Sequence, residues 1–159
     1  QVKTNEVHGM AQRGGSVIAH VRYGSEVFSP TVPEGTADAL GALEEIEALR
    51  YAHYIAPDGL AVVNVQSVVP VTVSSGAATY PEDGADRLRR AFPRLVYFDA
   101  TERAVELGNI RAANIVLLGA LSRGLALPLE AWEGAIASSV KEKHRYLNLK
   151  AFEIGRNIE

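Results

Sequence analysis

The chain has 159 residues, 47% hydrophobic and 22% charged, and this length and balance are typical of one soluble globular domain. A net charge of −3 argues against electrostatic nucleic-acid binding, and no apolar run approaches the roughly 20 residues that cross a membrane. Because cysteine is absent, the chain forms no disulfide and offers no thiolate to zinc or an iron–sulfur cluster. The four histidines lack a metal-binding spacing, so we expect a cytoplasmic protein with no metal site of its own.

The start of the chain is predicted to form two strands, over residues 2–7 and 16–23. Alternate side chains of a strand point the same way, which places His20 and Arg22 on one side of the second strand. These two residues either face a ligand or form the solvated edge of the strand. Residues 26–30 suggest one further short strand, which the prolines after it would end.

The loop between the first two strands runs from Gly9 to Gly15, whereas a tight hairpin turn needs only two residues. It is either a binding loop or a solvated turn. A guanidinium offers an oxyanion two parallel donors, so Arg13 either binds an anion or pins the loop to a carboxylate such as Glu6. Consecutive N–H groups in a glycine-rich bend can form an anion-binding concavity. The candidate ligand- or partner-facing residues are Glu6, His8, Gly9, Met10, Gln12, Arg13, Gly14, Gly15 and Ser16.

The middle of the chain is predicted to alternate between helices and strands. Apolar residues recur every third position from Ala37 to Leu49, and Thr36 is a suitable N-cap, so a helix is predicted over residues 36–55. The nearly unbroken apolar run at 60–65 predicts a central strand buried on both faces of a parallel sheet.

The remaining segments continue the alternation and end in helices. Pro70 makes residues 68–73 an edge strand or an extended linker. The other predicted segments are a loop over 74–79, a helix over 81–92, a strand over 95–98, a helix over 100–107, and three helical segments after residue 109, the last two over 129–140 and from 143. The arginines at 87, 89 and 90 form either a solvated helix face or a binding patch. The predicted fold is α/β: a mostly parallel, Rossmann-like sheet flanked by helices, with a helical C-terminal third.

Residues 6–22, Glu-Val-His-Gly-Met-Ala-Gln-Arg-Gly-Gly-Ser-Val-Ile-Ala-His-Val-Arg, resemble a signature of the gamma-domain family of 2-oxoacid:ferredoxin oxidoreductases, and within it the beta subunits of the indolepyruvate enzymes. This first motif is specific. Supporting similarity lies at 37–40 leading into 47–50, at 114–121 and at 148–155, so the resemblance covers almost the whole chain.

The resemblance implies that residues 1–159 form a single gamma-type domain, inactive alone, within a complex. Such a complex decarboxylates a 2-oxoacid, here indolepyruvate or another aryl pyruvate, forms the acyl-CoA and passes electrons to ferredoxin. Thiamine diphosphate, Mg and the 4Fe-4S clusters would belong to a larger catalytic subunit. The gamma-type domain would close over the active-site region and help to accommodate coenzyme A. The alternatives are a gamma subunit of a pyruvate- or 2-oxoglutarate-type enzyme and a stand-alone α/β binding module without catalysis.

One departure from the family concerns the start of the chain. The family opens with a strand and a Gly-x-Gly-Gly-Gln-Gly loop that leads into a helix, and this sequence contains neither. It begins at Gln1 without a methionine, so we expect the first β-α unit to be missing. The phosphate-type loop of the family has no counterpart in this sequence.

Overall fold

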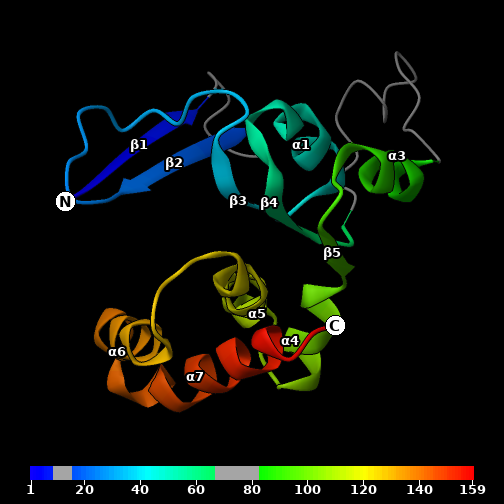
Figure 1. The fold of residues 1–159 in the computed structure, drawn as a ribbon. Coiled ribbons are helices and arrows are strands. Elements are labelled where there is room, and N and C mark those ends of the chain that lie inside the picture. The colour runs from blue at the N-terminus through cyan, green and yellow to red at the C-terminus, as the bar shows by residue number, and fades with distance from the viewer. Residues whose placement is uncertain (9–15, 67–82) are drawn as a thin grey trace.

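The computed structural model describes residues 1–8, 16–66 and 83–159 (Figure 1). The strands are β1 (Val2–His8), β2 (Val17–Tyr23), β3 (Ala37–Ala42), β4 (Ile55–Asn64) and β5 (Leu95–Phe98). The α-helices are α1 (Glu45–Arg50), α3 (Gly84–Ala91), α4 (Ala100–Glu106), α5 (Ala113–Leu121), α6 (Leu129–Ser139) and α7 (Glu142–Arg156). Short 3-10 helices are η1 (Ala52–Tyr54), η2 (Ile110–Ala112) and η3 (Ser122–Gly124). None of these helices is long and apolar enough to cross a membrane.

The strands form two sheets. β1 and β2 pair antiparallel as a hairpin, and β3, β4 and β5 form a parallel sheet in the order β3-β4-β5. β4 therefore lies in the centre of the parallel sheet, as its apolar run predicts. This arrangement, with helices around the sheet and a helical C-terminal part, confirms the predicted fold class (Figure 1).

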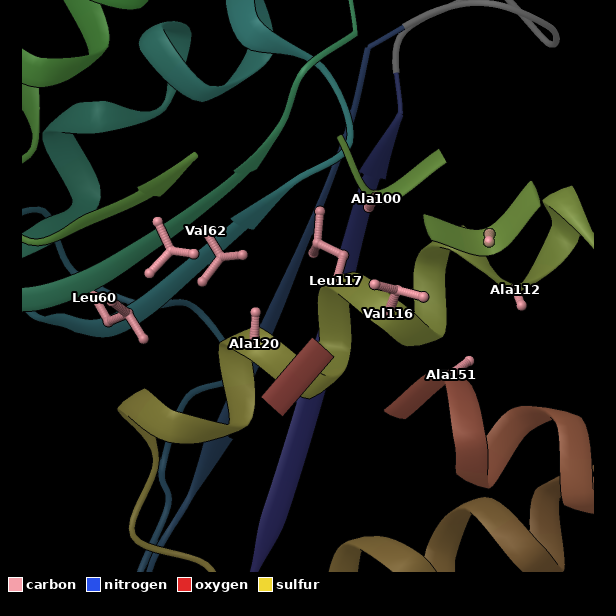
Figure 2. Close-up of a cluster of buried hydrophobic side chains, with 10 residues drawn as sticks. Leu60, Val62, Ala100, Ala112, Val116, Leu117, Ala120 and Ala151 are labelled. Carbon is pink, nitrogen blue, oxygen red and sulfur yellow. The ribbon is translucent and has the colours of Figure 1, made fainter. Parts of the chain in front are cut away.

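The core lies on both faces of β4 because its consecutive side chains point to opposite sides. Ala61 and Val63 pack in one cluster with α1 and α3. Leu60 and Val62 belong to a second cluster, formed with α4, α5 and α7. Figure 2 shows the second cluster, where the side chains of β4 face Leu117 and its neighbours on α5. The parallel sheet is thus the middle layer of a three-layer body.

The helices α5 and α7 pack so closely that two contact positions have no room for a side chain. A Cβ added at Gly155 would lie 1.8 Å from the carbonyl oxygen of Val116, and one at Gly119 would lie 2.2 Å from that of Phe152. These separations are far below van der Waals contact, so glycine on each helix is what permits the approach.

The predicted helix over residues 36–55 is wrong, because this stretch forms β3, α1 and η1 in turn. The three-residue recurrence of apolar side chains is real, but Leu40 and Ala42 also lie two residues apart on one face of a strand. Pairing with β4 selects the strand over the helix, and in the paired strands Leu40 lies beside Ala61. The N-cap is Glu44, whose carboxylate accepts from the Glu47 N–H at 2.8 Å. Thr36 instead donates to the carbonyl of Pro33 at 2.8 Å.

The predicted short strand over residues 26–30 is also wrong, since residues 24–36 contain no helix or strand. The later predictions are confirmed at β5, α3, α4, α5, α6 and α7, with ends that shift by a few residues. The predicted edge strand or linker at 68–73 and the loop at 74–79 lie outside the described residues, as do positions 81 and 82 of the predicted helix.

The close packing of α5 on α7 leads to a stability prediction. We expect Gly155→Ala to lower the free energy of unfolding by about 2–3 kcal/mol, because the added methyl must force the helices apart. The matched control is Gly134→Ala on α6, where the added Cβ would meet no heavy atom within 4 Å apart from its chain neighbours and the nearby backbone of its own helix. That variant should raise the free energy of unfolding by about 0.5–1 kcal/mol through helix propensity. Urea denaturation measures both, and equal stability of the two variants would contradict the packing argument.

Candidate functional site

The hairpin formed by β1 and β2 carries the described part of the predicted binding region. Glu6 lies opposite Ala19, and His8 lies opposite Val17, all four on one exposed face of the hairpin. The two strands predicted at the start of the chain are therefore confirmed. The loop candidates Gly9, Met10, Gln12, Arg13, Gly14 and Gly15 lie outside the described residues.

Ser16 is the first described residue after the loop, and it is fastened to α1. Its hydroxyl donates to the carboxylate of Glu47, and its oxygen lies 2.8 Å from the hydroxyl of Tyr51. Glu47 in turn forms an ion pair with Arg50 at 3.1 Å. The structure thus brings one predicted site residue together with three that the prediction missed. This network fixes the exit of the glycine-rich loop to the helical layer.

His20 and Arg22 have a role that neither of the two predicted alternatives describes. His20 is buried, and its Nδ1 accepts a hydrogen bond from the Val32 N–H at 3.0 Å. Arg22 donates from Nη1 to the carbonyls of Ser29 and Thr31, at 3.0 and 3.2 Å. Both side chains therefore hold residues 24–36, which we call the covering segment, against the back of the hairpin.

Further contacts secure the covering segment to the same face. Lys3 donates to the carbonyl of Phe28 at 3.1 Å, and the Val27 N–H donates to the side-chain carbonyl of Gln1 at 3.1 Å. Val27 itself is buried. Because the polar groups of this irregular segment are satisfied by hairpin side chains, it needs no strand pairing to pack there.

The base of the hairpin also contacts η1 through aromatic rings. The rings of His20 and Tyr54 meet edge to face, with centroids 5.0 Å apart and planes at 90°. Tyr54 lies beside His53 as well, at a centroid distance of 4.3 Å. Aromatic edge-to-face pairs stabilise by about 0.5–1.5 kcal/mol beyond their buried area. The hairpin is therefore tied to the α/β body at both its strand and its loop exit.

A second polar cluster lies at the carboxyl end of β4, the edge at which open α/β sheets commonly bind ligands. Asn64 is only 1% exposed, and its Oδ1 accepts from the Ala100 N–H at 2.8 Å. Its Nδ2 donates to the Leu43 carbonyl at 3.3 Å and to Gln66 Oε1 at 3.1 Å. Asn64 therefore joins the ends of all three parallel strands. Its sequence signal is a single amide that ends an apolar run.

A buried carboxylate lies near this edge on the other side of the sheet. The hydroxyl of Tyr97 donates to Glu45 Oε1 at 2.6 Å, which links β5 to the start of α1. The second oxygen of Glu45 lies close to Gly84, where an added Cβ would approach it to 2.7 Å. Glu45 has no distinctive signal in the sequence, because acidic residues also stand at positions 44 and 47.

The three arginines of α3 form local ion pairs. Arg87 and Arg90 contact Asp83 at 2.7 and 3.6 Å, and Arg89 contacts Asp86 at 3.1 Å. The hydrogen bond from Arg87 holds the pKa of the Asp83 carboxyl below its ordinary value. These contacts match the prediction of a solvated face, because the charges compensate each other at the surface.

The family of the chain follows from its similarity to known proteins. A family model described as pyruvate ferredoxin/flavodoxin oxidoreductase matches residues 1–158. The chain belongs to this family. It is 43% identical to a protein of Thermococcus kodakarensis named indolepyruvate oxidoreductase subunit IorB, over 98% of this chain and 79% of that protein. A protein of Archaeoglobus fulgidus with the same name is also 43% identical, with the same two shares covered.

A solved structure agrees with this assignment. It is the gamma subunit of a keto/oxoacid ferredoxin oxidoreductase from Geobacter sulfurreducens, which matches with a TM-score of 0.63 and 25% identity, covering 98% of this chain and 78% of that one. The predicted family is confirmed, and with it the assignment of the chain as a subunit of a 2-oxoacid:ferredoxin oxidoreductase.

The network at Ser16 leads to a second stability prediction. Ser16→Ala should lower the free energy of unfolding by about 1–2 kcal/mol. The substitution removes the hydrogen bond to the Glu47 carboxylate and the hydrogen bond between Ser16 and the Tyr51 hydroxyl. Tyr51→Phe should cost less in the Ser16→Ala background than in the wild type. The control is Ser138→Ala, because Ser138 is exposed on α6 and bonds only to a local carbonyl. Additive effects of the two substitutions in a double-mutant cycle would contradict the network.

Proposed function

We propose that this chain is the IorB-type subunit of an indolepyruvate:ferredoxin oxidoreductase. The observation that carries the proposal is 42–43% identity over 98% of the chain to three proteins named as that subunit. In the proposed reaction an aryl pyruvate loses carbon dioxide, its acyl group forms a thioester with the thiol of coenzyme A, the thiol proton is released, and two electrons pass to ferredoxin. The chain supports this reaction as a cytoplasmic gamma-type domain over residues 1–159.

The redox chemistry is proposed to reside in a larger partner subunit. Iron–sulfur clusters are held by cysteine thiolates, and this sequence contains no cysteine. Within residues 1–8, 16–66 and 83–159, no group of three His, Asp or Glu side chains is placed to hold a metal ion. Thiamine diphosphate with Mg and the 4Fe-4S clusters therefore fit the larger subunit, whose contact with ferredoxin completes the electron path.

Coenzyme A is the proposed ligand of the glycine-rich loop. Its phosphate groups suit a guanidinium and a series of backbone N–H donors, which the sequence supplies from Gln12 to Ser16. The described end of the loop supports this role, because Ser16 is fastened to α1. A loop that is anchored on a rigid element can orient its ligand contacts at little entropic cost.

Other 2-oxoacids are to be compared with indolepyruvate as substrates. The family is named for pyruvate, and the solved relative is named as a keto/oxoacid enzyme. A substrate panel on the assembled complex separates the indolepyruvate function from a pyruvate- or 2-oxoglutarate-type function.

The proposed location of the redox centres in the larger subunit leads to an activity prediction. The purified chain alone should reduce no viologen dye with any 2-oxoacid, whereas the complex with its larger subunit should do so with coenzyme A present. Indolepyruvate should give a higher kcat/KM than pyruvate or 2-oxoglutarate, measured by dye reduction under anaerobic conditions. Turnover by the chain alone would refute the location of the redox centres. A preference for pyruvate would refute the aryl-pyruvate assignment.

The loop proposal is tested by Arg13→Lys, which keeps the charge and removes the bidentate geometry. We expect the KM for coenzyme A in the reconstituted complex to rise about tenfold, the equivalent of one lost charge-assisted hydrogen bond. The melting temperature of the isolated chain should stay unchanged. Arg111→Lys, at an exposed position of η2, is the matched control. Lowered stability with unchanged kinetics would show instead that Arg13 pins the loop to the fold.

A further inference from the structure

The hydroxyl of Ser16 takes part in two hydrogen bonds at once, and the direction of each can be assigned. An ionised carboxylate only accepts hydrogen bonds, so Ser16 donates its single hydroxyl proton to Glu47. The same oxygen lies 2.8 Å from the hydroxyl of Tyr51. Because the proton of Ser16 is already used, Tyr51 is the donor in this second bond. The hydrogen bonds therefore run from Tyr51 to Ser16 to Glu47, and they leave Ser16 no proton to donate to a ligand.

Both partners of Ser16 are themselves held in place by α1. The N–H of Glu47 donates to the Glu44 carboxylate at 2.8 Å, and its own carboxylate forms the ion pair with Arg50. Tyr51 ends the helix, and its N–H donates to the carbonyl of Glu47 at 3.2 Å. Residues four positions apart lie on the same face of a helix, so the backbone fixes the distance between these two side chains. Ser16 therefore docks onto a preformed pair of groups.

The strand that follows Ser16 is held at a second point by the same part of the body. The ring of Tyr51 lies 6.4 Å from that of Tyr54, and the Tyr54 ring meets His20 edge to face. His20 comes four residues after Ser16, and four residues of strand span about 13 Å. One contact would fix a position and leave the direction of the strand free, whereas two separated contacts fix both. α1 and η1 thus determine where β2 starts and how it runs.

A fixed position of Ser16 has a consequence for ligand binding by the residues that directly precede it in the sequence. A segment with a fixed end has fewer conformations to lose when it binds, so binding costs less entropy. Loss of the fixing bonds leaves the binding groups in the chain but raises this cost. The ground state and the transition state are then weakened equally, which raises KM and leaves kcat unchanged.

We propose that Tyr51 and Glu47 are positioning residues for the binding of coenzyme A, and that they act through Ser16 without touching the ligand. The inference rests on the proposed function, from which the identity of the ligand comes. It assigns the Ser16 hydroxyl, one of the predicted ligand-facing groups, to a contact within the protein and not to the phosphates of coenzyme A.

The test is Tyr51→Phe in the complex with the larger subunit, assayed by dye reduction as coenzyme A is varied. This variant loses the hydroxyl and keeps the ring beside Tyr54. The KM for coenzyme A should rise about threefold to tenfold, as for one lost hydrogen bond, while kcat and the KM for indolepyruvate stay unchanged. Tyr54→Phe is the matched control, since Tyr54 contacts His20 and His53 through its ring. Its KM for coenzyme A should equal that of the wild type.

Two further substitutions test whether the effect passes through Ser16. Ser16→Ala should raise the KM for coenzyme A by the same factor, and Tyr51→Phe should add nothing in that background. Glu47→Gln keeps a carbonyl that accepts from Ser16, so it should raise this KM less than Glu47→Ala does. A further rise of the KM in the double variant would overturn the path through Ser16.

The remaining outcomes separate failure of the positioning role from failure of the proposed function. All assays are run at a temperature at which circular dichroism shows every variant to be folded. A lowered melting temperature of Tyr51→Phe with an unchanged KM, in a complex that depends on coenzyme A, would overturn the positioning role alone. An equal rise of the KM in Tyr54→Phe would also overturn it, because the effect would then reflect a general disturbance of η1. A wild-type complex that turns over without coenzyme A would overturn the proposed function and the inference together.

Discussion

The fold depends on a single strand that is apolar on both faces. β4 holds together two clusters, one with Ala61 and Val63 toward α1 and α3, and one with Leu60 and Val62 toward α4, α5 and α7. Asn64 ends this strand by joining the ends of its two neighbours through its amide. A buried amide with all its groups satisfied stabilises one arrangement of these segments over others, because any shift would leave a polar group unpaired.

The hairpin lies beside this body, and its position is set by polar contacts with α1 and an aromatic contact with η1. Ser16 fastens the exit of the glycine-rich loop to Glu47 and Tyr51, while His20 meets Tyr54 at the base of β2. The same hairpin holds the covering segment through Arg22 and Lys3. The side of the hairpin that carries Arg22 and Lys3 thus serves to hold the covering segment in place.

The comparisons with known proteins make this chain a subunit of a 2-oxoacid:ferredoxin oxidoreductase, so it works as one part of a complex. The given sequence contains no cysteine, and residues 1–8, 16–66 and 83–159 gather no group of three side chains that could hold a metal ion. What it does provide is a rigid α/β body that holds an exposed hairpin. Binding residues are placed most reproducibly when such a body fixes both ends of the segment that carries them.

The sequence by itself determined the elements whose pattern is local. The apolar run of β4 has only one stable environment, between two covered faces, and the helices after residue 109 have long helical periodicity. The residues at 6–22 indicated the family through their resemblance to a known signature. Those features belong to residues that are neighbours in the sequence, so they can be recognised without knowledge of the fold.

Only the tertiary structure decided the segments whose pattern allows two solutions. The residues of β3 fit a three-residue helical period as well as a two-residue strand period, and pairing with β4 selects the strand. The roles of His20, Arg22 and Ser16 depend on partners 7 to 35 residues away, which no local spacing reveals. The physical reason is the same in both cases: long-range pairing satisfies backbone and side-chain polar groups that local propensity leaves undetermined.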